Sequence, residues 1–350
     1  MPEAAAIQTA VSVRRCDDSD ARAWDAYVAR QPDASFFHRF GWQRVIRDAF
    51  GHRAYFLVAQ RDGVINGILP LVHLRSLLFG NSLISMPFCV YGGIVADDDD
   101  VREALRREGM SVARELGVDC LELRHRQRQF ADWPAKDLYV TFRKEIADND
   151  EENLMAIPRK QRAMIRKAQK TGLVSEVSDD LDTFYAMYSE SVRNLGTPVF
   201  SRRYFDILRE EFGDEVELLV VREQSTAVAA VMSFYHRDEV LPYYGGGTTR
   251  ARATKANDFM YWELMRLATS RGIRVFDYGR SKQGTGSYRF KKHWGFTPEP
   301  LHYEFGLVNA AEMPDISPAN PRYRMFIAAW KRLPLPVSRI LGPMLARDLG

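Results

Sequence analysis

The segment from residue 284 to 296, GTGSYRFKKHWGF, brings aromatic and cationic side chains together in a short stretch. Its Gly-x-Gly start predicts a tight turn, and the residues after it predict a short helix that ends on Gly295. Phe290 and Trp294 are four residues apart, so they share one helical face and should pack inward. Lys291 lies beside Phe290, where a partly buried ammonium could neutralise a developing oxyanion or hold a phosphate. A surface helix anchored by two aromatics is the alternative, but it leaves unexplained the cations Arg289, Lys292 and His293.

A second candidate segment, YYGGGTTRARATKAND at residues 243–258, joins a run of glycines to the start of a helix. Glycines after a strand let backbone N–H groups approach an anion, and a helix that begins near Thr254 would point its positive end the same way. A flexible surface turn is the alternative interpretation of this pattern. The candidate binding and catalytic residues of the segment are Tyr244, Gly245, Gly246, Arg250, Lys255 and Asp258.

A third candidate is the strongly basic segment IPRKQRAMIRKAQKTG at residues 157–172. Pro158 in the first turn and Gly172 at the end predict a single helix between them. Its cations, with Arg159 and Lys160 first along the chain, could bind the phosphates of a nucleotide, a lipid diphosphate or RNA. An exposed amphipathic helix without a ligand explains the pattern equally well.

Several catalytic signatures are absent from the sequence. It has no G-x-x-x-x-G-K-[ST] loop, no G-x-G-x-x-G after a strand and no G-x-S-x-G turn. The histidines lack the spacing of metal ligands and the three cysteines share no C-x-x-C spacing, so no metal site is expected. Kinases, nucleophile-dependent hydrolases and nicotinamide oxidoreductases are therefore disfavoured.

The elements that must position these residues occur twice along the chain. Each copy predicts a strand, a turn and a second strand, then a strand end broken by glycines, a helix that ends on glycine, and a final alternating strand. Two copies of one module predict an α/β (α+β) fold in which each module has a central mixed sheet flanked by helices. The matching segments are 55–72 and 217–234, 91–93 and 244–246, and 118–123 and 273–278.

Length and composition fit two domains without a membrane-spanning segment. The chain has 350 residues, at roughly 100–200 residues per domain, and the polar run at 147–152 marks the expected boundary. We therefore expect an N-terminal module at 1–147, a C-terminal module at 148–308 that carries the active site, and a tail at 309–350. The net charge of +3 is too small for a DNA-binding protein, and the N-terminus lacks a signal peptide, so a cytoplasmic protein is expected.

The tail has a character of its own, because residues 321–350 interleave arginines and lysines with apolar and aromatic residues. Such a basic amphipathic segment can lie on an anionic membrane surface, which would place the protein peripherally at the inner face of the membrane. More often such a tail packs back on its own domain, and we favour that interpretation.

The order of these motifs resembles the FemAB family, whose members are tandem GNAT-fold N-acyltransferases with the peptidoglycan aminoacyltransferases as the known type. The resemblance covers about residues 30–308. Within the family, residues 35–46 and 330–343 are similar to the FemAB-like proteins of PEP-CTERM/exosortase exopolysaccharide systems. The motifs are P-R-K-x-R-x-x-I-R-K-A at 158–168, YYGGG at 243–247, F-D-Y-G at 276–279 and Y-R-F-K-K-x-W-G-F at 288–296.

The resemblance implies two tandem GNAT-like modules and transfer of an acyl or aminoacyl group to an amine of a cell-envelope or exopolysaccharide precursor. The acceptor would be a small-molecule or lipid-linked saccharide. The donor would be a co-substrate (acyl-CoA, acyl-carrier protein or aminoacyl-tRNA) and no tightly bound cofactor is implied. In the peptidoglycan enzymes the lysine after the phenylalanine of F-K-K contacts the carrier end of the donor, and that lysine is Lys291 here, after Phe290.

Direct attack of the amine on an activated acyl group requires a deprotonated amine, a donor for the oxyanion and correct orientation. We expect Lys291 to stabilise the negative charge, supported by Arg280 and Arg289, while Asp258 or Tyr244 orients or deprotonates the amine. Asp277 is expected to hold the loop that carries Arg280. Two other functions stay open: a non-catalytic protein that binds an envelope saccharide or nucleotide sugar, and an RNA-binding module that uses the helix at 157–170.

Overall fold

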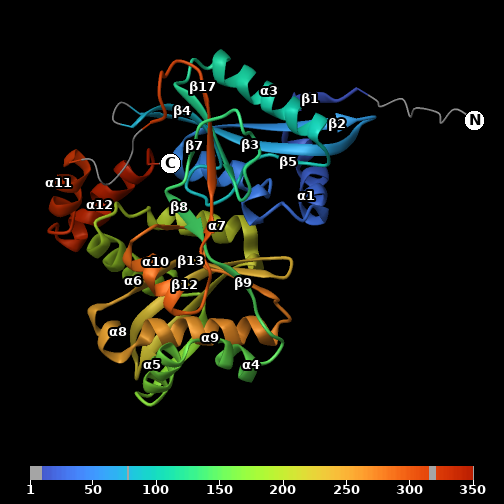
Figure 1. Ribbon diagram of the computed structural model, residues 1–350. Helices are drawn as coiled ribbons and strands as arrows, with labels where there is room; N and C mark the ends of the chain where they lie inside the picture. Colours follow the sequence, from blue (N-terminus) through green and yellow to red (C-terminus); the bar gives the residue numbers. More distant parts are fainter. Residues whose placement is uncertain (1–9, 77–78, 315–320, 350) are drawn as a thin grey trace, which may run out of the picture. The chain divides into compact units, whose positions relative to one another are not determined.

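The computed structural model describes residues 10–76, 79–314 and 321–349, and these fold into two compact units (Figure 1). Unit 1 contains the chain up to Lys136 together with His302–Pro314. Unit 2 contains Asp137–Leu301 together with the described residues 321–349. The chain therefore leaves unit 1 at residue 136 and returns to it at residue 302, whereas the sequence suggested modules at 1–147 and 148–308 followed by a tail at 309–350.

The polar run at 147–152 marks the start of a helix within unit 2. Helix α4 (Asp150–Ala156) is capped by Asn149, whose side-chain oxygen accepts a hydrogen bond of 2.9 Å from the Glu152 N–H. Acidic residues are favourable in this first turn because they complement the positive end of the helix dipole. The polarity that suggested a domain boundary therefore has a local cause.

The sheet of unit 1 has the strand order β1-β2-β3-β4-β6-β17-β7, with β5 paired to β3. Strands β4 and β6 are parallel, and the other pairs are antiparallel. The elements of unit 1 are β1 (Ser12–Arg15), η1 (Asp18–Asp20), α1 (Ala21–Arg30), η2 (Phe36–His38), α2 (Trp42–Phe50), β2 (Arg53–Arg61), β3 (Val64–Ser76), β4 (Gly80–Ser85), β5 (Val95–Ala96), α3 (Asp99–Glu115), β6 (Cys120–His125), β7 (Ala135–Lys136) and β17 (His302–Leu307).

Helix α3 confirms the first of the two predicted helices. Asp98 caps it by accepting from the Val101 N–H at 3.0 Å, and Val101, Leu105 and Val112 are buried in the core of unit 1. Gly92 and Gly93 differ from the prediction, because they lie between β4 and β5 and do not end a strand. The Gly93 N–H donates to the Arg124 carbonyl at 2.9 Å, so this loop packs against the end of β6.

A buried carboxylate joins the returning strand β17 to the rest of unit 1. Glu304 on β17 is fully buried and accepts hydrogen bonds from the N–H groups of Phe130 at 2.6 Å and Gln129 at 3.2 Å. His125 Nδ1 lies 2.8 Å from the same carboxylate, while His125 Nε2 accepts from the Ile94 N–H at 2.9 Å. This pattern fits a neutral histidine whose Nδ1–H donates to Glu304. Strand β17 therefore supplies the carboxylate that accepts hydrogen bonds from His125, Gln129 and Phe130, which come much earlier in the chain.

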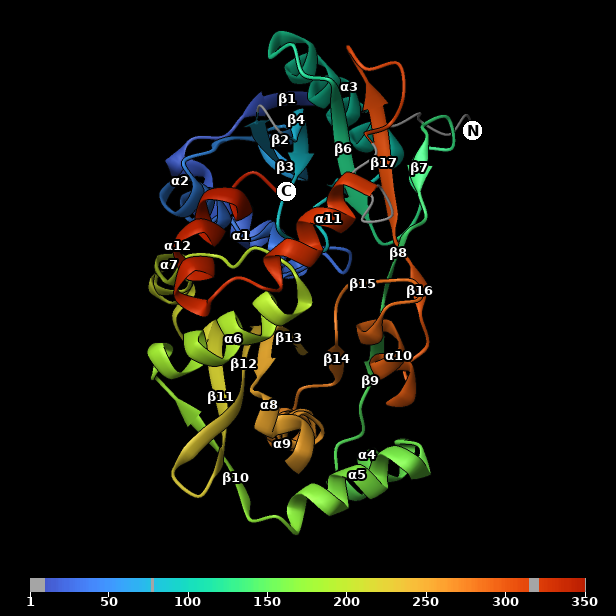
Figure 2. The ribbon, with the colours of Figure 1, turned by 90° about the vertical axis from the view of Figure 1, so that its left-hand side faces the viewer.

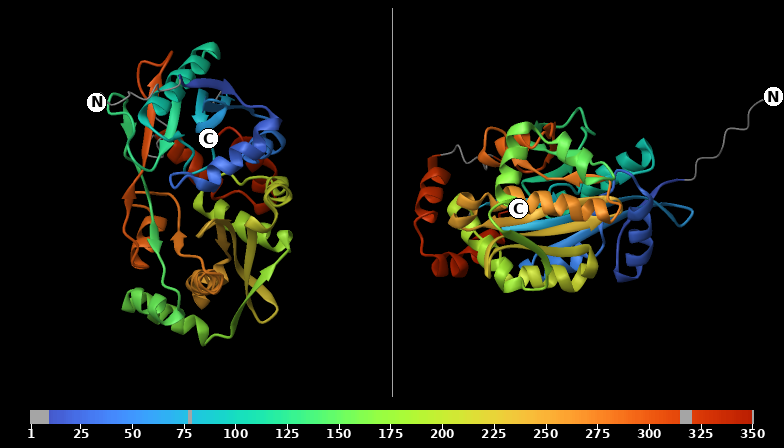
Figure 3. Two further views of the ribbon diagram at one scale, coloured as in Figure 1. Left: turned by 90° about the vertical axis from the view of Figure 1, so that its right-hand side faces the viewer. Right: turned by 90° about the horizontal axis from the view of Figure 1, so that it is seen from below.

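Unit 2 has a six-stranded sheet of order β10-β11-β12-β13-β14-β9 and a small sheet of order β15-β8-β16. In Figure 3 the yellow strands of the large sheet lie between the orange helix α9 and the yellow-green helices α6 and α7. The elements are β8 (Tyr139–Thr141), β9 (Arg143–Glu145), α4, α5 (Arg159–Gln169), β10 (Leu173–Ser178), α6 (Leu181–Leu195), α7 (Arg202–Phe212), η3 (Gly213–Glu215), β11 (Val216–Glu223), β12 (Thr226–His236), β13 (Glu239–Gly247), α8 (Thr249–Thr254), α9 (Ala256–Ser270), β14 (Val275–Asp277), β15 (Ser281–Lys282), α10 (Gly286–His293), β16 (Glu299–Pro300), α11 (Pro321–Trp330) and α12 (Leu335–Ala346).

The two units share one order of elements, which confirms the predicted α/β repeat. In unit 1 three antiparallel strands, β2 to β4, are followed by α3 and by β6, which is parallel to β4. In unit 2 the strands β11 to β13 are followed by α9 and by β14, which is parallel to β13. A helical crossover between parallel strands covers one face of the sheet, and this explains why each predicted helix has one apolar side.

The glycines of β13 show which helix covers each face of the unit 2 sheet. A Cβ on Gly245 would lie 3.2 Å from the Tyr261 hydroxyl of α9, whereas one on Gly246 would lie 2.5 Å from the Met187 carbonyl of α6. Consecutive strand residues point to opposite faces, so α9 and α6 cover the two sides of β13. Between Met232 and Ser233 of β12 the register with β13 shifts, so that Met232 lies opposite Tyr244 and Ser233 opposite Pro242.

We expect Gly246→Ala to destabilise unit 2 by about 1–3 kcal/mol or more, because the new methyl group would overlap the backbone of α6. Gly245→Ala is the matched control, since the nearest atom to its methyl group would be the end of the Tyr261 side chain at 3.2 Å, with Val231 at 3.7 Å. Urea unfolding followed by circular dichroism measures both variants. Equal destabilisation of the two would contradict the close approach of α6 to Gly246.

Candidate functional site

The segment predicted to carry the chemistry forms helix α10 at the end of the small sheet. Gly284 has a φ of +77°, Thr285 caps the helix, and the helix is followed by Gly295 with a φ of +83°. Trp294 is fully buried, and Phe290 packs against the core of unit 2. The predicted turn, helix and glycine stop are therefore confirmed.

Lys291 is the buried cation of this helix, with 9% of its surface exposed. Its Nζ donates to three backbone carbonyls, those of Tyr278 at 2.7 Å, Gly279 at 2.9 Å and Arg280 at 3.1 Å. Burial lowers the pKa of Lys291 to about 7, while the charge of Asp277 acts in the opposite direction. An ammonium has three N–H donors, so these carbonyls occupy all of them. In this structure Lys291 fixes the loop after β14 and does not point its donors toward open space.

Asp277, the last residue of β14, also holds this loop in place. Its carboxylate is fully buried and accepts from the Gly279 N–H at 2.6 Å and from the Thr141 hydroxyl at 3.2 Å. This confirms that Asp277 holds the loop that leads to Arg280. The loop is therefore bound on one side by a carboxylate and on the other by an ammonium.

Glu239, at the start of β13, is a functional candidate that the sequence reasoning missed. Arg143 donates to both of its carboxylate oxygens at 3.3 Å. Burial and, next, the neighbouring charge of Asp277 raise the pKa of Glu239 to about 7, while Arg143 acts in the opposite direction. The sequence signal was a single acid at the start of an apolar strand, which became meaningful only when β9 and β14 placed Arg143 and Asp277 beside it.

A pH effect follows from Glu239. Its pKa is raised in the folded state from 4.5 to about 7, so between these values the folded protein keeps a proton that the unfolded chain has lost. The free energy of unfolding should therefore fall as the pH rises through this window. Glu239→Gln should flatten that part of the profile while keeping an oxygen that Arg143 can donate to. Urea unfolding at about pH 5 and about pH 8 measures the difference, and an unchanged slope in the variant would contradict the assignment.

Asp258 lies in the first turn of α9 and joins three helices. It is buried, and its Oδ1 accepts from the Gln161 side chain on α5 and from the Trp294 indole N–H at 3.3 Å. Burial raises the pKa of Asp258, which makes its carboxylate a stronger base than an exposed aspartate. The aromatic rings of Tyr261 and Phe290, with centroids 5.5 Å apart, connect this region to Lys291.

Tyr244 lies on the other face of the sheet. Its hydroxyl is 2.7 Å from that of Tyr204, and its ring packs edge-on against Tyr188 of α6 and Phe205 of α7. Asp258 is on the α9 side, so β13 separates the two candidate bases. The structure thus brings Asp258 and Lys291 into one aromatic neighbourhood and places Tyr244 outside it.

The remaining candidates lie around α5, α8 and α10. Arg250 forms an ion pair with Glu223, with N···O distances of 2.6 and 2.8 Å, and the Arg280 guanidinium lies 4.6 Å from the ring centroid of Tyr139. Arg289 is exposed and donates to the Gly284 carbonyl at 3.3 Å. Arg159 and Lys160 are exposed at the start of α5, and Lys255 is half-buried at the junction of α8 and α9.

The predicted glycine turn differs in detail from the structure. Gly245 and Gly246 lie inside β13, and the helix expected near Thr254 is divided into α8 and α9. The division occurs at Lys255, whose φ of +61° is in the left-handed region and ends α8. The segment at 157–172 forms one helix, α5, as predicted, and Gln161, Ile165 and Ala168 face its buried side.

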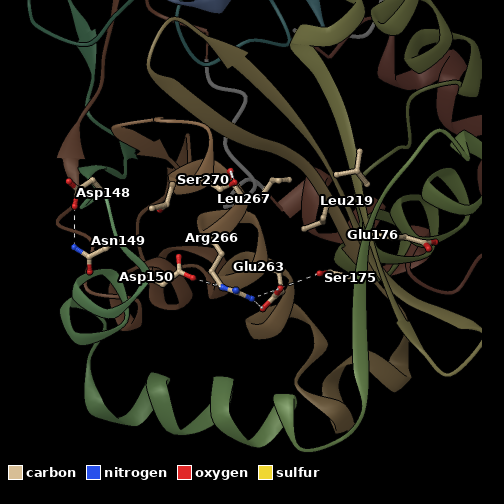
Figure 4. Close-up of a pocket in the computed structure, with 12 residues that line it drawn as sticks. Asp148, Asn149, Asp150, Ser175, Glu176, Leu219, Glu263, Arg266, Leu267 and Ser270 are labelled. Atoms are coloured by element: carbon tan, nitrogen blue, oxygen red, sulfur yellow. Dashed lines mark hydrogen bonds and ion pairs between the residues drawn. The ribbon is translucent and has the colours of Figure 1, made fainter.

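A pocket of 490 Å³ lies elsewhere in unit 2, and none of the predicted site residues lines it (Figure 4). Arg266 crosses it and donates to Asp150 at 2.7 Å and to Glu263 at 3.2 Å. Arg266 therefore partly neutralises the negative charge of Asp150 and Glu263 in the pocket. Across the described ranges, no group of three or more histidine, cysteine or acidic side chains is arranged to hold a metal ion.

Comparisons with known proteins bear on both units. Residues 159–292 match the family model described as "Acetyltransferase (GNAT) domain", a range that includes α5, β13, α9 and Lys291. No curated protein matches the sequence. Among solved structures, FemX is 16% identical, with 90% of this chain and 100% of FemX covered and a TM-score of 0.67.

Two further solved structures cover most of the chain at low identity. L-PGS from Bacillus licheniformis is 14% identical, with 96% of this chain and 98% of that chain covered and a TM-score of 0.57. A tandem GNAT protein from the clavulanic acid biosynthesis pathway is 10% identical, with 85% and 98% covered and a TM-score of 0.53. The chain therefore has a tandem GNAT fold, and its second unit contains the segment that matches the GNAT acetyltransferase domain.

Proposed function

We propose that the protein is an N-acyltransferase or aminoacyltransferase that moves an activated acyl group onto an amine by direct attack. The match to the GNAT acetyltransferase domain and the tandem GNAT fold support an acyltransferase. The proposed acceptor is an amine of a cell-envelope or exopolysaccharide precursor, a small or lipid-linked saccharide. The resemblance of residues 35–46 and 330–343 to the FemAB-like proteins of PEP-CTERM/exosortase systems supports this choice.

The observation that carries the proposal is the early end of the pairing between β13 and β14. These parallel strands pair at two positions, Glu239↔Val275 and Val240↔Phe276, although β13 continues to Gly247. Ligands of open α/β sheets bind at the carboxyl ends of parallel strands, and an extended ligand can align along a strand edge. The carrier arm of acyl-CoA, acyl-carrier protein or aminoacyl-tRNA would lie here as a co-substrate.

The reaction needs no enzyme-bound acyl group. The amine nitrogen attacks the acyl carbon, a C–N bond forms, and the C–S or C–O bond to the carrier breaks. The amine proton passes to a base, for which we propose Asp258, and the departing thiolate or alkoxide takes up a proton. Lys291 acts as a positioning residue that fixes the loop carrying Arg280, and Arg280 and Arg289 supply positive charge toward the donor.

The test presents the full-length protein with each donor class in turn. Labelled acetyl-CoA, acyl-carrier protein and aminoacyl-tRNA are each combined with amino sugars, nucleotide-linked amino sugars and lipid-linked saccharides, and acyl transfer is followed by mass spectrometry. We expect one donor to remain bound in native mass spectra and to acylate an amine. Binding of a saccharide with no donor bound and no transfer would instead favour a non-catalytic binding protein.

We expect Tyr244→Phe and Tyr204→Phe to have the same consequences, because each removes one half of a single buried hydrogen bond. Each should lower the free energy of unfolding by about 0.5–1.5 kcal/mol, since a buried hydroxyl–hydroxyl hydrogen bond is lost, and neither should change the transfer rate selectively. Unfolding curves and single-turnover rates measure this pair. A tenfold or greater loss of rate in Tyr244→Phe alone, about 1.4 kcal/mol, would restore Tyr244 as the base.

A further inference from the structure

Helix α12 packs on unit 2 through its smallest residues. Ser338, Gly342 and Ala346, spaced four apart, form its buried side. A Cβ on Gly342 would lie 2.8 Å from the backbone nitrogen of Val199, so only glycine permits this approach. Arg339 Nε donates to the Ser189 hydroxyl of α6 at 2.9 Å. The tail therefore does pack back on its own unit, as the sequence led us to expect.

The opposite side of α12 is apolar and exposed. Val337, Ile340, Leu341 and Met344 follow the i, i+3, i+4, i+7 spacing of a single helical face. Ile340 is 70% exposed and Met344 67%. A helix of a globular unit normally turns its large apolar residues inward, and here the small residues face inward instead. Helix α12 therefore exposes its large apolar side chains and buries its small residues against unit 2.

Helix α11 adds to this exposed surface. Met325 is 73% exposed, and Phe326, which stacks on Trp330 with centroids 5.4 Å apart, is 37% exposed. Figure 2 shows α11 and α12, in red, joined by a short turn at the end of the chain. Of the eleven large apolar residues exposed in the described part of the chain, six belong to these two helices. We name as the C-terminal apolar face the residues Met325, Phe326, Val337, Ile340, Leu341 and Met344.

Cations flank this face, and the carboxylate beside them, Asp348, is paired with Arg347 at 3.4 Å. Lys331 and Arg332 are exposed in the turn between the two helices, and Arg347 is exposed just after α12. The sequence has no acidic residue between Asp315 and Asp348. An apolar helix face bordered by lysine and arginine is the combination that binds the boundary between headgroups and acyl chains of an anionic bilayer.

We propose that the C-terminal apolar face docks on an anionic membrane surface, with Lys331, Arg332 and Arg347 at the headgroups and the apolar side chains among the acyl chains. No helix in the described ranges combines the length and apolar content needed to cross a bilayer. A second copy of the chain is a poorer occupant, because face-to-face packing would bring Lys331 and Arg332 of both copies together, and no acidic residue lies between Asp315 and Asp348.

The experiment measures flotation of the full-length protein with vesicles. We expect binding to phosphatidylglycerol–phosphatidylcholine vesicles and little binding to phosphatidylcholine alone, with a loss at high salt because the cations are exposed. The double variant Ile340→Gln, Met344→Gln should bind about tenfold more weakly or worse, given the transfer energy of apolar side chains. Lys331→Gln with Arg332→Gln should remove most of the preference for anionic lipid.

The matched control is Val174→Gln with Val177→Gln on β10, where the two valines are 61% and 52% exposed. This control should bind vesicles like the unchanged protein. Because the substituted side chains are exposed, all variants should keep the same circular dichroism spectrum. Failure to bind anionic vesicles, or equal binding by the Ile340 and Met344 variant, would overturn the proposal. So would a dimer in analytical ultracentrifugation that only this variant abolishes, because the face would then be a contact between copies.

Discussion

Lys291→Met should slow acyl transfer by about 10²–10³, the loss seen when a catalytic charge arrangement is removed. The reason is positional, because the Lys291 ammonium holds three consecutive carbonyls of the loop after β14. Methionine preserves the length and most of the volume of the side chain but donates no hydrogen bond. The loop after β14 and Arg280 would then lose their fixed position near the point where β13 and β14 stop pairing.

Lys292→Met is the control for this prediction, since Lys292 is the next residue of α10 and is exposed. It should transfer the acyl group within about twofold of the unchanged rate. Single-turnover assays report the rate, and circular dichroism reports whether α10 remains folded. If Lys291→Met folds and retains full activity, then Lys291 has no part in the reaction. Recovery by Lys291→Arg would indicate that positive charge near the loop is enough.

Glu304→Ala should lower the free energy of unfolding by about 3–5 kcal/mol, because it leaves several donors without their acceptor at a cost of about 1–3 kcal/mol each. The change removes the acceptor for two backbone N–H groups and for His125, all within the core of unit 1. Those donors are enclosed by protein and would find no substitute, so the cost exceeds that of a lost surface contact.

Guanidinium chloride unfolding followed by tryptophan fluorescence measures this effect, with Glu312→Ala as the exposed control on the same returning segment. Glu304→Gln should have a smaller effect than Glu304→Ala, because its amide oxygen can still accept from the Phe130 N–H. A change of less than about 1 kcal/mol in Glu304→Ala would mean that the buried acceptor contributes little to unit 1.

The parts of the fold that the sequence predicted are those determined by local patterns. Helices α3 and α9 follow from apolar residues at helical spacing, and α10 follows from glycines placed around two aromatics. The strand pairs at 55–72 and 217–234 follow from apolar runs on either side of a polar turn. In each of these the residues that specify the element are close together in the chain, so their spacing is sufficient.

The parts that it missed depend on contacts between distant segments. Tyr244 and Asp258 were grouped because they are close in sequence, but the irregular register at Tyr243 and the alternation of β13 put Tyr244 on the α6 side. Glu239 gained its unusual environment only from residues about a hundred positions before and forty after it, on β9 and β14. No local spacing encodes such a meeting of strands.

The return of the chain to unit 1 has a consequence for biosynthesis. Strand β17 lies between β6 and β7, so the sheet of unit 1 stays open along β6 until residues 302–307 have been translated. A ribosome releases the chain from the amino terminus onward, and unit 2, whose large sheet is complete by residue 277, has all of its strands available first. The second copy of the repeat is thus in a position to fold ahead of the first, and the nascent amino-terminal half must be kept from aggregating through an exposed strand edge in the meantime.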